Sequence, residues 1–149
     1  MGPCRRGRYT GTRRPRSGSR DVVDQPPRSL PASRQAPSEA RRHVSEVCAG
    51  WPASQLRVAQ LLTTEIVTNA VVHGSGEVVL RVAGGDHVLR VEVSDDGPGL
   101  PGPVSPTSPR QRGGRGLRIL AAMATVWGVE PRDDGAGKTV WFELRRAVA

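Results

Sequence analysis

The stretch LLTTEIVTNAVVHG, residues Leu61–Gly74, decides the fold because it predicts a buried helix that carries polar side chains on its apolar face. Successive residues of a helix are about 100° apart. On that wheel one broad apolar face is formed by Val58, Leu61, Leu62, Ile66 and Val72. Glu65 and Asn69 lie in the middle of this face. The opposite, more polar side is formed by Arg57, Gln60, Thr63, Thr64 and Thr68.

The Glu65 carboxylate needs an explanation, because an unpaired carboxylate facing a core costs several kcal/mol. Asn69 follows it by one helical turn and His73 by two, so three polar groups converge on one side of the helix. Two interpretations remain open at this point. Either Glu65 pairs with an arginine from elsewhere and Asn69 caps a neighbouring strand, or these groups line a cavity that holds a ligand.

The positive charge of the chain is concentrated near its N-terminus. Residues 1–34 contain nine arginines and two aspartates, a net charge of +7 out of the total of +8. Residues 35–149 are therefore nearly neutral. A nucleic-acid-binding domain is expected to carry its charge on a folded face, so direct binding of nucleic acid by the folded part is not expected.

Residues 1–27 form a tail rich in Arg, Gly, Pro and Ser, with too few apolar residues to order itself. We expect a disordered segment that is either a solvated extension or a weak electrostatic contact for nucleic acid or an acidic partner. No apolar run in the chain has the length of an export signal or a membrane span. We therefore expect a cytoplasmic protein without a membrane contact, with one folded domain over residues 28–146.

The two cysteines give no sign of a metal site. Cys4 lies in the tail and Cys48 in a helical pattern, without CxxC or Cys/His ligand spacing. We expect two free thiols and no metal held by sulfur.

The remaining pattern predicts helices before and after a β-hairpin. Ser38 is expected to begin a helix over residues 38–48, and Ser54 is the expected N-cap of the central helix. Residues 77–83 and 87–93 alternate apolar with polar side chains around a Gly-Gly-Asp turn. This predicts an antiparallel hairpin with one face on helices and the other in water. Two further strands are expected at residues 125–130 and 138–144.

Glycine-rich segments follow the hairpin. Asp95 ends its second strand, and Gly97 and Gly99 let the backbone approach a flat ligand closely. A proline-rich loop over residues 101–112 has a length typical of lids, binding loops or disorder. The loop ends in Gly-Gly-Arg-Gly at residues 113–116, which opens a helix over LRILAAMATVWG and offers free N–H groups to an anion. The chain has neither a P-loop nor a GxGxxG dinucleotide motif.

Four motifs occur in the order and spacing of the GHKL ATPases, and the chain resembles that superfamily over about residues 28–146. The motifs are ExxxNAxxH (Glu65, Asn69, Ala70, His73), VxDxGxGL (Val93, Asp95, Gly97, Gly99, Leu100), GxGL (Gly114, Gly116, Leu117) and GxT (Gly137, Thr139). The ExxxNAxxH form and the small size resemble most the anti-sigma-factor serine/threonine kinases, which have a histidine kinase-like ATPase domain. A histidine sensor kinase is disfavoured because no helix with a phosphoacceptor His precedes the ATPase part.

The resemblance implies a site for ATP and Mg²⁺. Asn69 would hold the metal ion, and Glu65 would be the catalytic group that orients or deprotonates the nucleophile. Asp95 would accept a hydrogen bond from the exocyclic amine of adenine and so select ATP over GTP, with support from the Thr139 hydroxyl. The other nucleotide-binding residues that it implies are His73, Gly97, Gly99, Gly113, Gly114, Arg115, Gly116 and Leu117. For His73, a place at the edge of the site and a place in the packed core remain open.

The implied fold is a two-layer α/β (α+β) sandwich. A mixed, mainly antiparallel sheet would be covered by helices on one face, with an ATP lid between the glycine motifs. The implied function is that of a regulatory serine/threonine kinase that phosphorylates a Ser on a small antagonist protein, the anti-anti-sigma protein, and sequesters a sigma factor. Such proteins are usually homodimers. The alternative is a nucleotide-dependent binding module without significant kinase activity.

Overall fold

The computed structural model describes residues 22–97, 112–133 and 135–147. The expected lid and most of the expected tail lie outside these residues. The elements in chain order are β1 (Val23–Asp24), β2 (Arg28–Leu30), α1 (Ala36–Val47), α2 (Ala53–His73), β3 (Val78–Gly84), β4 (Val88–Asp95), α3 (Arg112–Met123), β5 (Val126–Pro131) and β6 (Lys138–Arg145).

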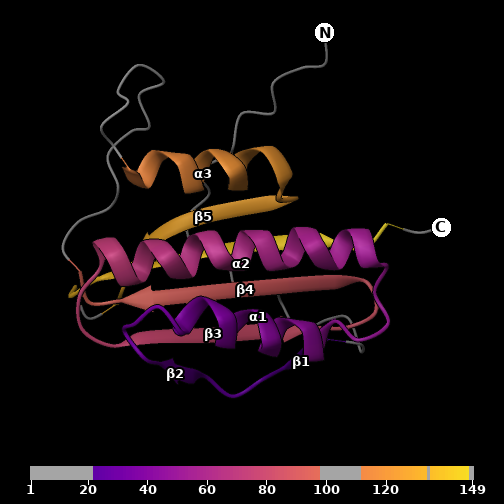
Figure 1. Cartoon of the computed structure of the whole chain (residues 1–149), viewed down its shortest axis with the longest axis horizontal. Coiled ribbons are helices and arrows are strands. Elements are labelled where there is room, and N and C mark those ends of the chain that lie inside the picture. The colour runs from indigo at the N-terminus through magenta and orange to yellow at the C-terminus, as the bar shows by residue number, and fades with distance from the viewer. Residues whose placement is uncertain (1–21, 98–111, 134, 148–149) are drawn as a thin grey trace, which may run out of the picture.

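A single sheet forms one layer of the molecule and three helices form the other (Figure 1). The strand order is β1-β3-β4-β6-β5, and β2 also pairs with β3. Every strand pairing in the described residues is antiparallel. Helix α2 lies between α1 and α3 and contacts both of them as well as the sheet. The prediction of a two-layer sandwich with helices on one face is confirmed, and so are the predicted hairpin and the last two strands.

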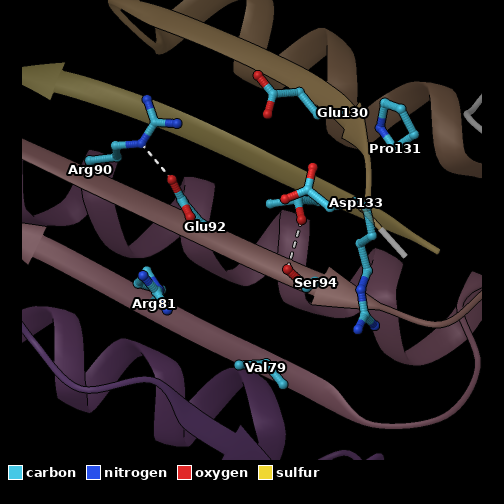
Figure 2. Close-up of a pocket in the computed structure, with 10 residues that line it drawn as sticks. Val79, Arg81, Arg90, Glu92, Ser94, Glu130, Pro131 and Asp133 are labelled. Carbon is cyan, nitrogen blue, oxygen red and sulfur yellow. Dashed lines mark hydrogen bonds and ion pairs between the residues drawn. The ribbon is translucent and has the colours of Figure 1, made fainter. Parts of the chain in front are cut away.

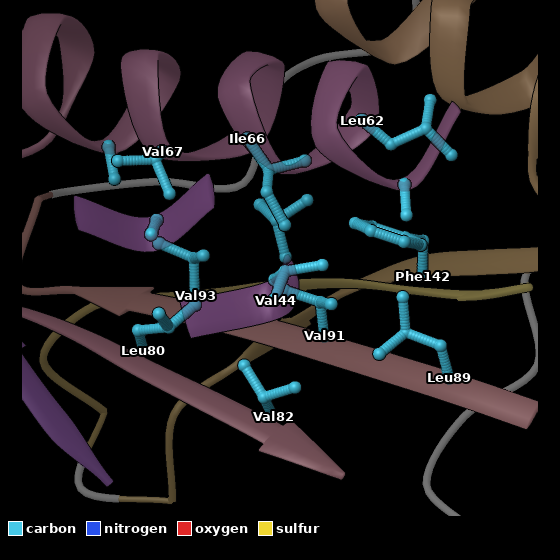
Figure 3. Packing of buried hydrophobic residues seen from close by; sticks show 14 of the residues in the cluster. Val44, Leu62, Ile66, Val67, Leu80, Val82, Leu89, Val91, Val93 and Phe142 are labelled. Carbon is cyan, nitrogen blue, oxygen red and sulfur yellow. The ribbon is translucent and has the colours of Figure 1, made fainter. Parts of the chain in front are cut away.

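The core lies between α2 and the middle strands (Figure 3). Leu62, Ile66 and Val67 of α2 are at most 1% exposed, and they face Phe142 of β6 and Val91 and Val93 of β4. In β3 buried residues alternate with more exposed ones, as expected of a strand that has one dry face, and β4 departs from this pattern only at Arg90, which is buried between Leu89 and Val91. Each fully buried aliphatic side chain contributes about 1.5–3 kcal/mol, so this contact fixes α2 on the sheet.

The apolar face predicted for the central helix is partly wrong. Leu61 and Val72 are 39% and 61% exposed, whereas Thr63 is fully buried and its hydroxyl donates to the Ala59 carbonyl at 2.7 Å. The reason is that α2 is covered by the sheet, by α1 and by α3 at once, so no single stripe describes its contacts. Glu65 and Asn69 are half-buried and do not lie in the middle of the sheet-facing side.

Both predicted helix starts are also wrong by a residue or two. Helix α1 begins at Ala36 with a proline in its first turn, so Ser38 lies inside it. Helix α2 begins at Ala53 after Pro52, so Ser54 is not its N-cap. Neither helix start has a side-chain cap hydrogen bond. Proline suits the first turn because its missing N–H would have no intrahelical partner there.

The sheet begins before residue 28, where the folded domain was expected to start. Val23 and Asp24 of β1 pair with Gly84 and Ala83 of β3. The next residue extends this pairing, since the Gln25 N–H donates to the Val82 carbonyl at 2.9 Å. Residues 23–25 therefore belong to the sheet and not to the tail. In the described part of the chain, no helix has the length and apolar character needed to cross a bilayer.

Candidate functional site

Glu65 and Asn69 of α2 meet the backbone of α3 at Gly116. A Cβ atom placed on Gly116 would lie 2.9 Å from Asn69 Nδ2 and 3.5 Å from Glu65 Oε2. Gly116 itself is buried. Because only a glycine leaves room for both polar side chains here, α3 can approach them closely. The structure thus brings together three of the residues predicted for the site.

The glycine-rich segment opens α3, as predicted. Gly113 and Gly114 lie in the first turn of this helix, which begins at Arg112. The first N–H groups of a helix have no intrahelical partner, and the helix dipole makes this end positive. The helix start is therefore suited to a phosphate. The side chains of Arg115 and Leu117 lie outside the described part, as do Gly99 and Leu100 of the preceding motif.

Asp95 ends β4 and is only 1% exposed. Its Oδ1 accepts a hydrogen bond from the Gly97 N–H at 2.7 Å. Gly74, at the end of α2, lies so close that a Cβ there would be 2.6 Å from the Asp95 carboxyl carbon. Gly137, with a φ of 135°, passes against the Asp95 backbone and leaves no room for a side chain. Backbone at Gly74 and Gly97 therefore lies against this carboxylate, and Gly137 packs on the Asp95 backbone.

The two groups of residues are connected by the C-terminal half of α2. Gly74 follows Glu65 by nine positions, which is about 13–14 Å along a helix. The Glu65 and Asn69 side chains with the start of α3 mark one end of this path, and Asp95 marks the other. An extended ligand with an anionic end near α3 and a hydrogen-bonding base near Asp95 fits this arrangement.

Thr139 does not lie beside Asp95, although the sequence predicted that it supports the base contact. In the β4–β6 pairing Ser94 is opposite Thr139 and Asp95 is opposite Lys138. Successive side chains of a strand point to opposite faces. The Ser94 hydroxyl on the helix-free face (Figure 2) is hydrogen-bonded to the Thr139 hydroxyl at 2.8 Å.

That helix-free face contains a hollow of about 660 Å³, separate from the predicted site (Figure 2). It is lined by Val79, Arg81, Arg90, Glu92, Ser94, Glu130, Pro131, Arg132, Asp133 and Thr139. Arg90 is held there by Glu92 Oε1 at 2.7 Å and Glu143 Oε1 at 2.9 Å, and it stacks on the Trp141 ring at 4.1 Å. These basic and acidic side chains compensate one another.

The residue facing Asp95 is Lys138, which sequence reasoning missed. Its side chain is 10% exposed, and Nζ lies 3.3 Å from each carboxylate oxygen of Asp95. Its position follows from the register of β4 against β6, which the alternation within each strand does not reveal. One signal was available: the sequence contains 21 arginines and this single lysine.

The structure also places His73 and Cys48. His73 is exposed at the end of α2, so the interpretation as a packed core residue is excluded. Cys48 is a free, buried thiol at the end of α1. Burial raises the pKa of the Cys48 thiol to about 11, so it stays protonated near neutral pH and is a poor nucleophile or metal ligand.

Comparison with protein families agrees with this geometry. The family described as "Histidine kinase-like ATPase domain" matches residues 30–144. The chain belongs to this family. Its membership confirms the resemblance to the GHKL ATPases and implies that the domain binds a nucleotide. The histidine kinase-like ATPase domain thus begins close to β2 and ends within β6.

Comparison with solved structures gives the same fold. The crystal structure of the RsbU and RsbW domains of Rv1364c from Mycobacterium tuberculosis is similar, with a TM-score of 0.61 and 23% sequence identity. The similarity covers 84% of this histidine kinase-like ATPase and 34% of the other chain. The protein therefore spans about a third of the length of that relative. A comparison with curated proteins gives no match.

Proposed function

We propose that this protein is an ATP- and Mg²⁺-dependent serine/threonine kinase of the anti-sigma-factor type that acts in the cytoplasm. Its substrate would be a Ser on a small antagonist protein, and the kinase, as a homodimer, would also sequester a sigma factor. The observation that carries the proposal is the convergence of Glu65 and Asn69 on Gly116, near the start of α3. Phosphoryl transfer requires positioning and neutralisation of charge, and a carboxylate, an amide and a helix start can supply these in one place.

The residues present fit a nucleotide with Mg²⁺. The Asn69 amide oxygen is a hard, neutral ligand of the kind that Mg²⁺ accepts beside phosphate oxygens. When bound, the ion neutralises charge on the phosphates. The free N–H groups at the start of α3 would hold the terminal phosphate. Asp95, enclosed by backbone at the other end of the path, would accept from the base.

Glu65 would then act on the nucleophile. The Ser hydroxyl of the substrate would attack the γ-phosphorus, a new P–O bond would form to the Ser oxygen, and the bond to the bridging oxygen would break to release ADP. The hydroxyl proton would pass to the Glu65 carboxylate. Glu65 is half-buried and lies one helical turn from Asn69, so it can reach a nucleophile beside a phosphate held by Asn69 and α3.

The proposal is tested by separating nucleotide binding from phosphate transfer. Glu65→Ala should lower turnover by about 10²–10⁴-fold, the usual range for a general base, with little change in ATP affinity. Asn69→Ala should weaken Mg²⁺–ATP binding and abolish transfer with it. The measurements are calorimetry with Mg²⁺–ATP and transfer of the γ-phosphate to the co-purified antagonist. Thr68→Ala is a matched control, because Thr68 is exposed on the same helix.

The outcomes distinguish the kinase from a binding module. If the wild-type protein binds ATP and captures its partner but transfers no phosphate, the kinase proposal is wrong and a nucleotide-dependent binding module remains. Equal transfer by Glu65→Ala and the wild type would also contradict the catalytic role of Glu65. If the folded wild-type protein binds no nucleotide, the whole proposal is wrong.

A further inference from the structure

Asp96 lies between two residues of the predicted base subsite, Asp95 and Gly97, but its own side chain makes its contacts elsewhere. The Asp96 side chain is 41% exposed, whereas that of Asp95 is 1% exposed. Despite this exposure, Asp96 is bonded to two other segments of the chain. It therefore joins the end of β4 to parts of the molecule that are distant in sequence.

The first connection is to the turn between α2 and β3. The Asp96 N–H donates to the Ser75 carbonyl at 2.8 Å, and the Glu77 N–H donates to Asp96 Oδ2 at 3.2 Å. Gly76 lies between these two residues with a φ of 70°, and a Cβ placed on it would overlap Asp96 Oδ2. Since glycine alone leaves this space open, the turn lies directly against the carboxylate.

The second connection is to the turn between β5 and β6. Arg132 forms an ion pair with Asp96 Oδ1. The Arg132 N–H also donates to the Gly137 carbonyl at 3.0 Å, and the Arg132 carbonyl accepts from the Gly135 N–H at 2.9 Å. The backbone of Arg132 thus closes the turn, and its side chain fixes the turn on the end of β4.

The same two turns carry glycines that pack against Asp95. Gly74 begins the turn after α2, and a Cβ on it would lie 2.6 Å from the Asp95 carboxyl carbon. Gly137 ends the turn before β6 and packs on the Asp95 backbone. A polar group that selects a ligand must be held within about 0.5 Å of its productive position. Displacement of either turn would therefore move the backbone that holds the Asp95 carboxylate.

We propose that Asp96 is a positioning residue of the base subsite, which acts through both turns to hold Asp95 where it selects adenine over guanine. This inference rests on the proposed nucleotide site, in which Asp95 accepts from the exocyclic amine of adenine. Guanine presents its O6 acceptor at that place and is opposed by a fixed carboxylate. An exposed ion pair contributes little to stability, so the loss of Asp96 is expected to act on selectivity more than on folding.

The test is calorimetry of the full chain with Mg²⁺–ATP and with Mg²⁺–GTP. The wild-type protein should prefer ATP. Asp96→Ala should lower the ATP affinity by about 10–100-fold, the range for groups that support a site, and the GTP affinity much less. The ratio of the two affinities should therefore shrink, whereas a general loss of structure would lower both and keep the ratio. Glu92→Ala is the matched control, because it removes the partner of Arg90 in the same strand, away from the subsite, and it should leave the ratio unchanged.

Two substitutions of Arg132 test the same role without changing Asp96. Arg132→Lys can keep the ion pair and should bind ATP nearly as well as the wild type. Arg132→Met should lose ATP affinity, and adding it to Asp96→Ala should cause little further loss, because both changes remove the same pair.

The outcomes separate this role from the site itself. An unchanged ratio in folded Asp96→Ala, or additive losses in the double variant, would overturn the positioning role while ATP binding stands. Folded wild-type protein that binds neither nucleotide would instead overturn the proposed nucleotide site.

Discussion

Strands β4 and β6 carry two polar pairs at adjacent positions, and the pairs differ because they lie on opposite faces of the sheet. On the helix-free face Ser94 and Thr139 share a hydrogen bond between half-exposed hydroxyls. On the helix-covered face Asp95 and Lys138 form a buried ion pair. Water can replace the partner of a hydroxyl on the first face, but it reaches the charges on the second face poorly. A shift of one residue along a strand thus decides whether a side chain belongs to the site.

The two faces also hold charges in different ways. On the helix-free face Arg90 contacts two carboxylates, those of Glu92 and Glu143, which are 24% and 19% exposed. On the covered face a single cation meets a single carboxylate that is 1% exposed. The cost of removing a partner is expected to follow the burial of the group left behind. This expectation can be tested on each face.

The largest effect is expected from Lys138→Met, which leaves the Asp95 carboxylate buried and unpaired. Removing one partner of a buried ion pair costs about 3–5 kcal/mol in the free energy of unfolding. Urea unfolding followed by circular dichroism measures this loss. Thr139→Val, the neighbouring change on the open face, should cost only about 0.5–1.5 kcal/mol. Equal losses for the two variants would contradict the expectation that the cost of removing a partner follows the burial of the group left behind.

A double variant identifies the cause of the loss. If Lys138→Met is costly because Asp95 remains charged in a dry place, then adding Asp95→Leu should recover much of the lost stability. The non-additivity is the quantity to measure. Additive losses would show that the two side chains stabilise the fold independently.

An intermediate effect is expected from Arg90→Met on the open face. The change removes two charge-assisted hydrogen bonds and the stacking on Trp141, but Glu92 and Glu143 can still reach water. We expect a loss of about 1.5–3 kcal/mol, measured by the same urea unfolding. Salt should reduce the loss in part, because these charges are near the surface. If Arg90→Met lost more free energy of unfolding than Lys138→Met, removing a charged partner would cost more on the helix-free face than on the helix-covered face, contrary to the expectation.

Most of the fold could be predicted because its signals are local. The alternation around the Gly-Gly-Asp turn predicts the β3–β4 hairpin, and the glycine-rich segment before an apolar helix predicts α3. The starts of α1 and α2 were misplaced because Ser38 and Ser54 are residues of a type that often caps a helix, but both lie inside the first turn. The apolar face of α2 was misplaced because three elements cover this helix.

The site could be predicted only as far as its motifs are local in sequence. Glu65 and Asn69 are one turn apart on the same helix, and Gly116 meets both of them. Sequence reasoning missed Lys138 because its contact with Asp95 depends on the pairing of two strands, and the two residues are more than 40 positions apart in the chain. Thr139 was preferred because its type fits the GxT motif, whereas the register places it on the other face.

The smallest effect concerns His43, a titratable group buried on the covered side in α1. Burial, reinforced by the charge of Arg28, holds the pKa of the His43 imidazole below its ordinary value of 6.5, although Glu46 acts in the opposite direction. Below about pH 6.5 the unfolded chain therefore binds a proton that the folded chain does not. Stability should fall as the pH decreases through 6.5 and level off below the pKa of the folded state.

The slope of this pH dependence is at most about 1.4 kcal/mol per pH unit for one histidine. Urea midpoints measured between about pH 7.5 and pH 5 should show it. His43→Leu should remove the His43 part of the slope, because no imidazole is then left to protonate on unfolding. His87→Leu is the matched control, since His87 is exposed in the turn between β3 and β4, and it should keep that slope. His87→Leu could instead flatten the pH dependence of the urea midpoint while His43→Leu leaves it unchanged. In that case the buried His43 is not the source of the acid sensitivity. Burial of a titratable group would then not predict its effect on stability, as the comparison of Asp95 with Arg90 assumes.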